Sequence, residues 1–398
     1  MGFVIGHLDK SILEDKGMTV STAVDDTSIY GVTFADFDPA NNKYSTVGTR
    51  TDDAVGYNFE PSTLTYGGVD DFVKRKSGPF NIRECVTVRT SGFNHEVVAY
   101  KGDPNWDSIK TNSSYNRMIE FPKFYYYRPD RYTFLVSSTM YAGFLPSPMH
   151  YRDGVMLDKV YLSKYQMNTN GMSQTGTGAW VSSTLEQTRA KAREKGCYLF
   201  DAKIAYTLAM LCYIKYANMD AQACIGVGYA NSSGSQNQGV SDGVLSMDGR
   251  TTTTATENCN IVCLGIENLY AHNYTRLDGM FKNNDTIYIA DEISQIVSNP
   301  NGSDWTGYTA VPTKVATSSN WQTLHAFDSD FPYLMFPIAV GGNESQSSRD
   351  YYYYSSGLRE SYFWDFSNCG SQCGLLCLNL CSSVGHSDSS IGASFFHG

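Results

Sequence analysis

The sequence predicts an α+β protein in which a β-rich N-terminal region precedes a part with two main helices and many short strands. Three observations lead to this fold class. Aromatic-rich runs alternate at period two up to about residue 140, two helical patterns lie near the middle, and short apolar runs separated by loops follow residue 226. At 398 residues, the chain is long enough for two or three domains.

The first 140 residues read as β-hairpins. The runs ECVTVRT, HEVVAYKGD and MIEFPKFYYY alternate at period two and are bounded by turn residues. One short helix is considered at Gly67–Lys76. The run Asp153–Met167 predicts a further strand pair, with Asp153 and Gly154 as its turn.

Two helices are predicted in the middle of the chain. Ser183 and Glu186 fit a capping box at the start of the first helix, and Gly196 marks its C-terminal end. The second helix lies within residues 199–223. Its apolar residues recur at helical spacing on one face, at Ile204, Leu208, Leu211, Cys212 and Tyr216.

Composition and charge argue against several classes of protein. The formal net charge of −10 argues against a nucleic-acid-binding face, which needs a basic patch. No segment approaches the roughly eighteen uninterrupted apolar residues of a membrane span. The N-terminal residues MGFVIGHLDKS lack the basic and apolar parts of a secretory signal. We therefore expect a protein that folds in the cytoplasm, does not insert into a membrane and binds no nucleic acid.

Four cysteines near the C-terminus recur at four-residue spacing, at Cys369, Cys373, Cys377 and Cys381. The glycines and serines among them exclude a helix, and on an extended strand successive cysteines stand roughly 13 Å apart. One zinc ion needs each sulfur within about 2.3 Å, and a disulfide needs Cα atoms within about 7 Å. Only a bent backbone would allow either, so we predict no metal site and no cofactor.

The remaining six cysteines carry no motif. Cys85, Cys197, Cys212 and Cys224 stand singly among apolar residues, which predicts buried reduced thiols. Cys259 and Cys263 lie four residues apart in an expected strand, where a core or fortuitous position is the default.

The last 38 positions use a restricted alphabet. From Ser361 to Gly398 the chain contains no Lys, Glu or Met. Apart from Trp364 and Gln372, every residue there can be encoded by a codon that ends in a pyrimidine. Randomising the first two bases of Asn codons would produce this alphabet, cysteine included.

With this tail, the sequence resembles the variable proteins of diversity-generating retroelements, above all the receptor-binding tail proteins of phages. The segments similar to the constant part of that family are Gly48–Tyr57, Val97–Asp103, Ile119–Tyr127 and Asp153–Gln166. Lys195–Asn218 and Leu264–Gly279 resemble the C-type-lectin-type core shared with formylglycine-generating enzymes. The tail resembles the variable region, with Gly-Leu-Leu, Leu-Asn-Leu and Ile-Gly-Ala-Ser as fixed scaffold.

The resemblance implies a domain organisation and a set of site residues. Residues 1–145 would form a β-rich region for oligomerisation or tail attachment. Residues 146–398 would form a C-type-lectin-like ligand-binding domain, with the variable region at about 341–398. The residues expected on one solvent-facing, ligand-binding surface are Tyr351, Tyr353, Tyr362, Asp365, Phe366, Asn368, Cys369, Cys373, Cys377, Cys381, Ser383, His386, Asp388 and Ser390.

The resemblance also implies a function. It predicts a non-enzymatic, hypervariable protein at a phage tail-fibre tip that binds a bacterial surface receptor, protein or glycan. Other tail proteins are expected partners, and we expect a homotrimer. In such a surface, aromatic residues supply contact area and small polar residues supply hydrogen bonds. Tyr351–Ser356 fits this description, although a core strand with alternate rings buried is an equal alternative. Trp364 is expected to belong to the framework.

Three alternatives stay open. A cysteine-dependent enzyme like the formylglycine-generating enzymes would need an activated thiol, and only His386 lies near enough in sequence to lower a thiol pKa. A bacterial surface adhesin would share the fold. Calcium could bind the oxygen ligands Asp278, Asn283, Asn284 and Asp285, although a solvated turn is the favoured interpretation there.

Overall fold

The chain is described by a computed structural model over residues 27–36, 45–61, 70–74, 78–232, 237–245, 247–290, 292–296 and 298–398. Short strands dominate this part of the protein. The strands of the first half are β1 (Ile29–Thr33), β2 (Thr49–Asp52), β3 (Arg83–Ser91), β4 (Asn94–Tyr100), β5 (Asn116–Pro122), β6 (Tyr125–Tyr127), β7 (Thr133–Ser137), β8 (Leu145–Pro146), β9 (Tyr151–Arg152), β10 (Val155–Met156), β11 (Lys159–Ser163) and β12 (Tyr198–Leu199).

The second half continues with short strands and few helices. Its strands are β13 (Gly249–Arg250), β14 (Ile261–Cys263), β15 (Ile266–Glu267), β16 (Tyr274–Asn283), β17 (Thr286–Ala290), β18 (Tyr308–Lys314), β19 (Asn320–His325), β20 (Pro337–Val340), β21 (Tyr351–Tyr354), β22 (Leu358–Phe363), β23 (Leu378–Leu380), β24 (Ile391–Gly392) and β25 (Phe395–His397). The helices of the described residues are α2 (Asp71–Lys74), α3 (Trp106–Ile109), α4 (Leu185–Glu194), α5 (Ala202–Tyr216), α6 (Ala221–Cys224), η1 (Ile293–Gln295), η2 (Glu344–Gln346) and η3 (Gly370–Gln372).

The two predicted helices are confirmed as α4 and α5, but the capping box of α4 lies one residue later than predicted. Thr184, and not Ser183, accepts the backbone N–H of Gln187 at 3.2 Å, and the Gln187 side chain accepts the Thr184 N–H at 2.8 Å. Ser183 is buried, and its carbonyl accepts the Arg276 guanidinium. Glu186 instead accepts the backbone N–H of Asn299. The contacts around α4 therefore determine which of two adjacent hydroxyl residues caps the helix.

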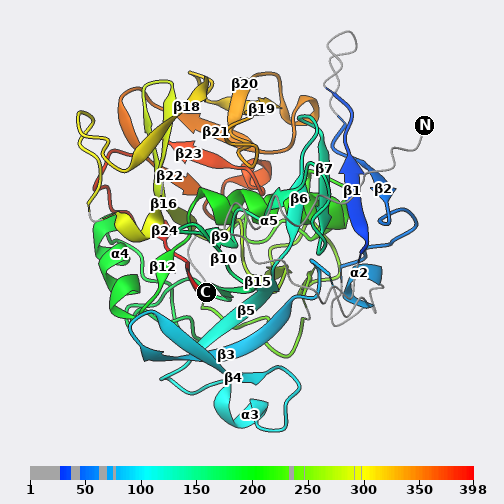
Figure 1. Cartoon of the computed structure of the whole chain (residues 1–398), viewed down its shortest axis with the longest axis vertical. Helices are drawn as coiled ribbons and strands as arrows, with labels where there is room; N and C mark the ends of the chain where they lie inside the picture. Colours follow the sequence, from blue (N-terminus) through cyan, green and yellow to red (C-terminus); the bar gives the residue numbers. More distant parts are fainter. Residues whose placement is uncertain are drawn as a thin grey trace.

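Helix α5 is buried along its whole length and on all sides, whereas the sequence predicted one apolar face. Asp201 caps its N-terminus by accepting the Ile204 N–H at 3.0 Å, and Ala217 ends it in the left-handed conformation. The helix lies at the centre of the molecule and contacts β1, β7 and β16 (Figure 1). A helix that is apolar all round is typical of the core of a large protein.

The sheets combine segments from both ends of the chain. One sheet has the order β2-β1-β7-β6-β8, and a second has the order β12-β25-β11-β5-β3-β4. In the second sheet β11 pairs antiparallel with β5 on one side and with the C-terminal strand β25 on the other. Residues on both sides of the predicted boundary after residue 145 thus share a sheet, and one hydrophobic core extends from Tyr30 to Phe396.

The second sheet curls so that its outer strands approach each other. The hairpin of β3 and β4 brings Phe93 against Tyr198 of β12, with stacked ring centroids 4.7 Å apart. His95 of β4 stacks on His397 of β25 at 3.9 Å. A β-rich chain with few helices and a curled sheet is consistent with a lectin-like fold.

The turns agree with the predicted hairpins. Asp153 and Gly154 both have positive φ, at 50° and 79°, and connect β9 to β10 as a two-residue turn requires. Of the helix considered at 67–76, α2 covers 71–74, and residues 67–69, 75 and 76 lie outside the described residues. None of the helices in the described part has both the length and the apolar character needed to cross a bilayer.

Replacing Thr184 with alanine tests the observed cap of α4. The T184A variant should lose about 1 kcal/mol of unfolding free energy, because the Gln187 N–H loses its acceptor. The matched S183A variant should change stability by less than about 0.5 kcal/mol, since the Ser183 hydroxyl is buried without a hydrogen-bond partner among the described residues. Urea denaturation followed by circular dichroism measures both. A larger loss for S183A would assign the cap to Ser183.

Candidate ligand-binding face

The predicted variable region folds onto the largest sheet. This sheet has the order β18-β17-β16-β22-β23-β21-β19-β20, with β24 beside β16. Strand β23 pairs in parallel with β21 and antiparallel with β22. Side chains alternate between the two faces of a strand, and Tyr352 lies in the main core with Leu378 and Leu380. Tyr351 and Tyr353 therefore point to the opposite face, away from α5.

A row of three aromatic rings lies on this opposite face. Trp321 of β19 packs edge-on against Tyr351, with ring centroids 5.4 Å apart. Tyr351 in turn lies 4.8 Å from Tyr353. All three rings are partly exposed. The sequence interpretation missed Trp321, which precedes the expected variable region at residue 341. Its only signal was a single tryptophan in the polar run SSNWQTLH.

A buried carboxylate ties this aromatic row to the next loop. Asp365 is fully buried, and its Oδ2 lies 3.1 Å from the Tyr353 hydroxyl and accepts the Cys377 thiol at 3.3 Å. Its Oδ1 accepts the backbone N–H of Phe366. The Tyr353 hydroxyl also lies 2.8 Å from Gln372 Oε1. Burial, with Cys377 and Asp365 nearby, raises the pKa of Tyr353, so this side chain is a neutral donor.

The loop that follows β22 has an unusual backbone. Trp364, Asp365 and Asn368 all have positive φ, at 70°, 44° and 70°. Such conformations cost roughly 1–3 kcal/mol each for residues other than glycine and persist only where the surroundings hold them. Trp364 Nε1 donates to the Leu375 carbonyl at 3.2 Å, and the Asn368 N–H donates to the Tyr229 carbonyl. The framework role predicted for Trp364 fits its burial.

The backbone of the four C-terminal cysteines is bent and does not form the extended strand that was considered for them. Helix η3 lies between Cys369 and Cys373, because Gly370 takes a left-handed φ of 60° and turns the chain. Only 378–380 form a strand in this segment. All ten cysteines are free thiols, and no group of three or more His, Cys, Asp or Glu in the described residues is placed to hold a metal ion.

The structure buries four of the positions that were expected on the surface. They have at most 1% of their surface exposed and comprise Tyr362, Asp365, Cys373 and Cys377. For these four, the expectation of display toward solvent is corrected. Their side chains make internal contacts, such as the hydrogen bond from the Cys373 thiol to the Phe366 carbonyl. Burial and Asp365 raise the pKa of the Cys377 thiol well above its usual range, which keeps it in the neutral form.

The other ten expected positions reach solvent to different degrees. The exposed ones are Asn368, Ser383 and Asp388. The partly exposed ones are Tyr351, Tyr353, Phe366, Cys369, Cys381, His386 and Ser390. The structure thus brings part of the expected set together around Asp365 and leaves the loop at 383–390 as a separate group.

A buried ion pair holds the loop at 383–390. Arg276 Nη1 donates to Glu360 Oε2 at 2.8 Å, and Nη2 donates to the His386 carbonyl at 2.9 Å. The second oxygen of Glu360 accepts the Gly385 N–H at 2.7 Å. Tyr362 completes this group, because its hydroxyl lies 3.2 Å from Arg276 Nη1. Arg276 and Glu360, which lie outside the expected variable set, therefore anchor this loop. Variable positions also contribute, because Asp388 Oδ1 accepts the Ser390 N–H at 2.8 Å.

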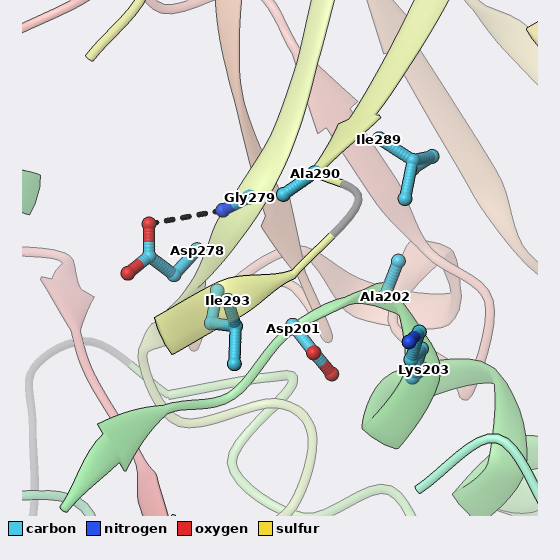
Figure 2. A pocket seen from close by; sticks show the side chains of 8 residues that line it. All are labelled: Asp201, Ala202, Lys203, Asp278, Gly279, Ile289, Ala290 and Ile293. Carbon is cyan, nitrogen blue, oxygen red and sulfur yellow. Dashed lines mark hydrogen bonds between the residues drawn. The ribbon is translucent and has the colours of Figure 1, made fainter. Parts of the chain in front are cut away.

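A small cavity lies at the start of α5, on the other side of the large sheet (Figure 2). Its volume of about 10 Å³ holds roughly one water molecule. Figure 2 shows Asp201 and Lys203 on one side and Gly279, Ala290 and Ile293 on the other. A cavity of this size has no room for an organic ligand.

The oxygen ligands considered for calcium do not form one group. Asp278 is committed to Arg189, whose Nη2 and Nε lie 2.6 and 2.8 Å from its carboxylate oxygens. Asn283, Asn284 and Asp285 lie at the turn between β16 and β17, where Asn284 has a positive φ of 54°. The turn is the favoured interpretation for this segment.

Comparison with known proteins gives structural neighbours only. No family model matches the chain, and no curated protein matches its sequence. Three solved structures are variants of a protein named Major Tropism Determinant. The alignment with the U1 variant covers 79% of this chain and 71% of that variant, with 9% identity and a TM-score of 0.31. The alignment with the M1 variant covers 92% of this chain and 85% of that variant, with 9% identity and a TM-score of 0.32. The alignment with the P3c variant covers 92% of this chain and 86% of that variant, with 9% identity and a TM-score of 0.30.

The three neighbours are thus variants of one named protein. TM-scores of 0.30 to 0.32 at 9% identity are too low to establish a shared fold or function.

Asp350 anchors the turn beneath β21, and its protonation should make the stability of the protein depend on pH. Its Oδ1 accepts the Leu376 N–H at 2.9 Å, whereas its Oδ2 is buried without a hydrogen-bond partner among the described residues. Burial raises the pKa of Asp350 from 3.8 to about 8. Between these two values the folded chain retains a proton that the unfolded chain has lost, so stability should fall as pH rises from about 4 to about 8.

The D350N variant imitates the neutral acid and should flatten this pH dependence. At pH 7 it should be more stable than the wild type by up to about 4 kcal/mol, with the difference vanishing near pH 4. Urea denaturation across this pH range measures it, and D107N, at an exposed carboxylate, is the control. Parallel stability curves for wild type and D350N would show that Asp350 is ionised in the folded state.

A tyrosine substitution should affect stability differently at a buried and at an exposed position of the expected variable set. The C377Y variant should lose at least about 1–3 kcal/mol of unfolding free energy, because the fully buried site has no space for the ring. The S383Y variant should change stability by less than about 0.5 kcal/mol, since Ser383 is exposed. Urea denaturation of both proteins is the measurement. Equal stability of C377Y and wild type would mean that the interior adapts to diversified residues.

Proposed function

We propose that this protein is a hypervariable ligand-binding protein that recognises a bacterial surface receptor through the outer face of its large sheet. The outer face is here defined as Trp321, Tyr351, Tyr353, Phe366, Asn368 and Cys369. The observation that carries the proposal is the row of three partly exposed rings on a fixed backbone, next to a segment with the restricted alphabet of a diversified region.

The aromatic row has the physical properties of a binding surface. Tyrosine and tryptophan bury large areas on contact and lose little conformational entropy, which is why they dominate the energetics of many interfaces. Trp321 and Tyr353 each hold Tyr351 from one side, so its ring is already ordered before a ligand arrives. A preordered surface avoids part of the entropic cost of binding.

The loop beside the row supports the same role. Gln372 and Asp365 connect it to Tyr353, and its positive-φ residues are held by backbone hydrogen bonds. Asn368 projects from this fixed loop into solvent. The six residues of the outer face include no Asp, Glu, Lys or Arg. We therefore expect the ligand to be recognised by aromatic contacts and hydrogen bonds and not by ion pairs.

We also propose a location, partners and an oligomeric state for the protein that carries this surface. The sequence resemblance supports a phage tail-fibre tip, contact with other tail proteins through residues 1–145, and a homotrimer. Three copies of the outer face on one particle would bind through avidity, which raises a weak single-site affinity by orders of magnitude without a new contact. The proposed role is binding and not catalysis.

Alanine variants of the aromatic row test the proposed function. W321A and Y351A should each weaken attachment of the labelled full-length protein to receptor-bearing bacteria at least tenfold, because anchors of this type contribute about 2 kcal/mol or more. Flow cytometry over a panel of bacterial strains measures attachment. The matched control is F93A, which removes a 42%-exposed ring on the β3–β4 hairpin.

Circular dichroism first verifies that each variant is folded. Attachment that is unchanged in W321A and Y351A, or reduced as much in F93A, would place the binding site elsewhere.

A further inference from the structure

Two cysteines from distant parts of the chain meet in the main core. Cys212 lies on α5 and Cys263 ends β14, 51 positions further along the sequence. Their Sγ atoms are 3.2 Å apart, and both residues are fully buried. The expected core positions of these cysteines are observed, but their proximity was not predicted.

A hydrogen-bond network holds the two sulfurs in place. The Tyr216 hydroxyl lies 2.9 Å from Cys263 Sγ and donates to Asp248 Oδ1 at 2.8 Å. Asp248 also accepts the Leu264 N–H at 2.9 Å and pairs with Lys215 at 2.5 Å. Leu264, which follows Cys263, and Lys215 and Tyr216, one helical turn after Cys212, therefore all bind one carboxylate. This arrangement fixes the end of α5 against the end of β14.

We propose that Cys212 and Cys263 form a disulfide when the chain folds in the presence of a small disulfide such as oxidised glutathione. The thiolate of one cysteine attacks the glutathione disulfide, forms a mixed disulfide and releases one reduced glutathione. The thiolate of the second cysteine then displaces the other glutathione. In total, the two protein thiols are oxidised to one S–S bond and one glutathione disulfide is reduced to two thiols.

The cross-link should form during folding and not afterwards. Burial and the neighbouring Cys263 raise the pKa of the Cys212 thiol, so the attacking thiolate is scarce in the folded protein. Glutathione is also too large to reach a fully buried sulfur. Once formed, the bond would be protected from reductants because both sulfurs are fully buried.

This pair is better placed than the other thiols for a stabilising cross-link. The thiols of Cys373 and Cys377 donate to the Phe366 carbonyl and to Asp365. Cys369 also contacts Cys373, but these two residues are only four apart. A disulfide stabilises more when it closes a longer loop, so a bridge from Cys212 to Cys263 would have the larger effect.

Refolding of the full-length protein provides the test. The protein is refolded with a mixture of reduced and oxidised glutathione, and free thiols are then blocked with N-ethylmaleimide under denaturing conditions. We expect eight blocked thiols out of the ten cysteines and a non-reduced peptide that joins Cys212 to Cys263. The melting temperature should be several degrees higher than that of protein refolded under reducing conditions.

The C212A and C263A variants should lose both the joined peptide and the stabilisation by oxidation. C85A, which removes a buried cysteine of another core cluster, should keep both. Ten blocked thiols in the wild type, or a joined peptide between other cysteines, would overturn the proposal even if a variant fails to fold. The Cys212–Cys263 disulfide does not depend on ligand binding. The attachment assay with W321A and the thiol count therefore test the two proposals separately.

Discussion

The complete burial of α5 is the constraint on which the rest of the structure depends. A helix without a polar face must be covered on every side, and no single sheet can do this. Strands β1 and β7 of the N-terminal region cover one side, and β16 of the large sheet covers another. Tyr206 of α5 also packs edge-on against Phe363 of β22, with centroids 5.2 Å apart. The helix thus requires segments from both ends of the sequence.

The outer face follows from this requirement. Because Tyr352, Leu378 and Phe363 are needed to cover the helix, period-two alternation places Tyr351 and Tyr353 on the other side of the same sheet. The display of aromatic rings is therefore the consequence of a well-packed core and needs no flexible loop. It also explains why Tyr351 and Tyr353 reach solvent on the outer face, whereas Tyr352 is fully buried.

The sequence predicted a β-rich chain with two long helices, but not the local geometry of the site. Apolar spacing located α5, since a helical pattern of that length has few other interpretations. Adjacent Ser183 and Thr184 satisfy the same capping rule, and contacts with Arg276 and Asn299 elsewhere in the chain separate them. The bend at Cys369 depends on a left-handed Gly370, which no spacing rule reveals. Trp321 was missed because its role depends on pairing between β19 and β21.

The buried members of the expected variable set impose a limit on diversity. Asp365 needs the Tyr353 hydroxyl and the Cys377 thiol as donors, because a buried carboxylate without partners is strongly unfavourable. A change at any one of these three positions therefore affects the other two. The backbone hydrogen bond of Phe366 does not depend on the Phe366 side chain, whereas the positive φ of Asn368 favours Asn, Asp or Gly at that position. Free variation is thus expected where the backbone holds the loop, whereas positions around Asp365 must change together.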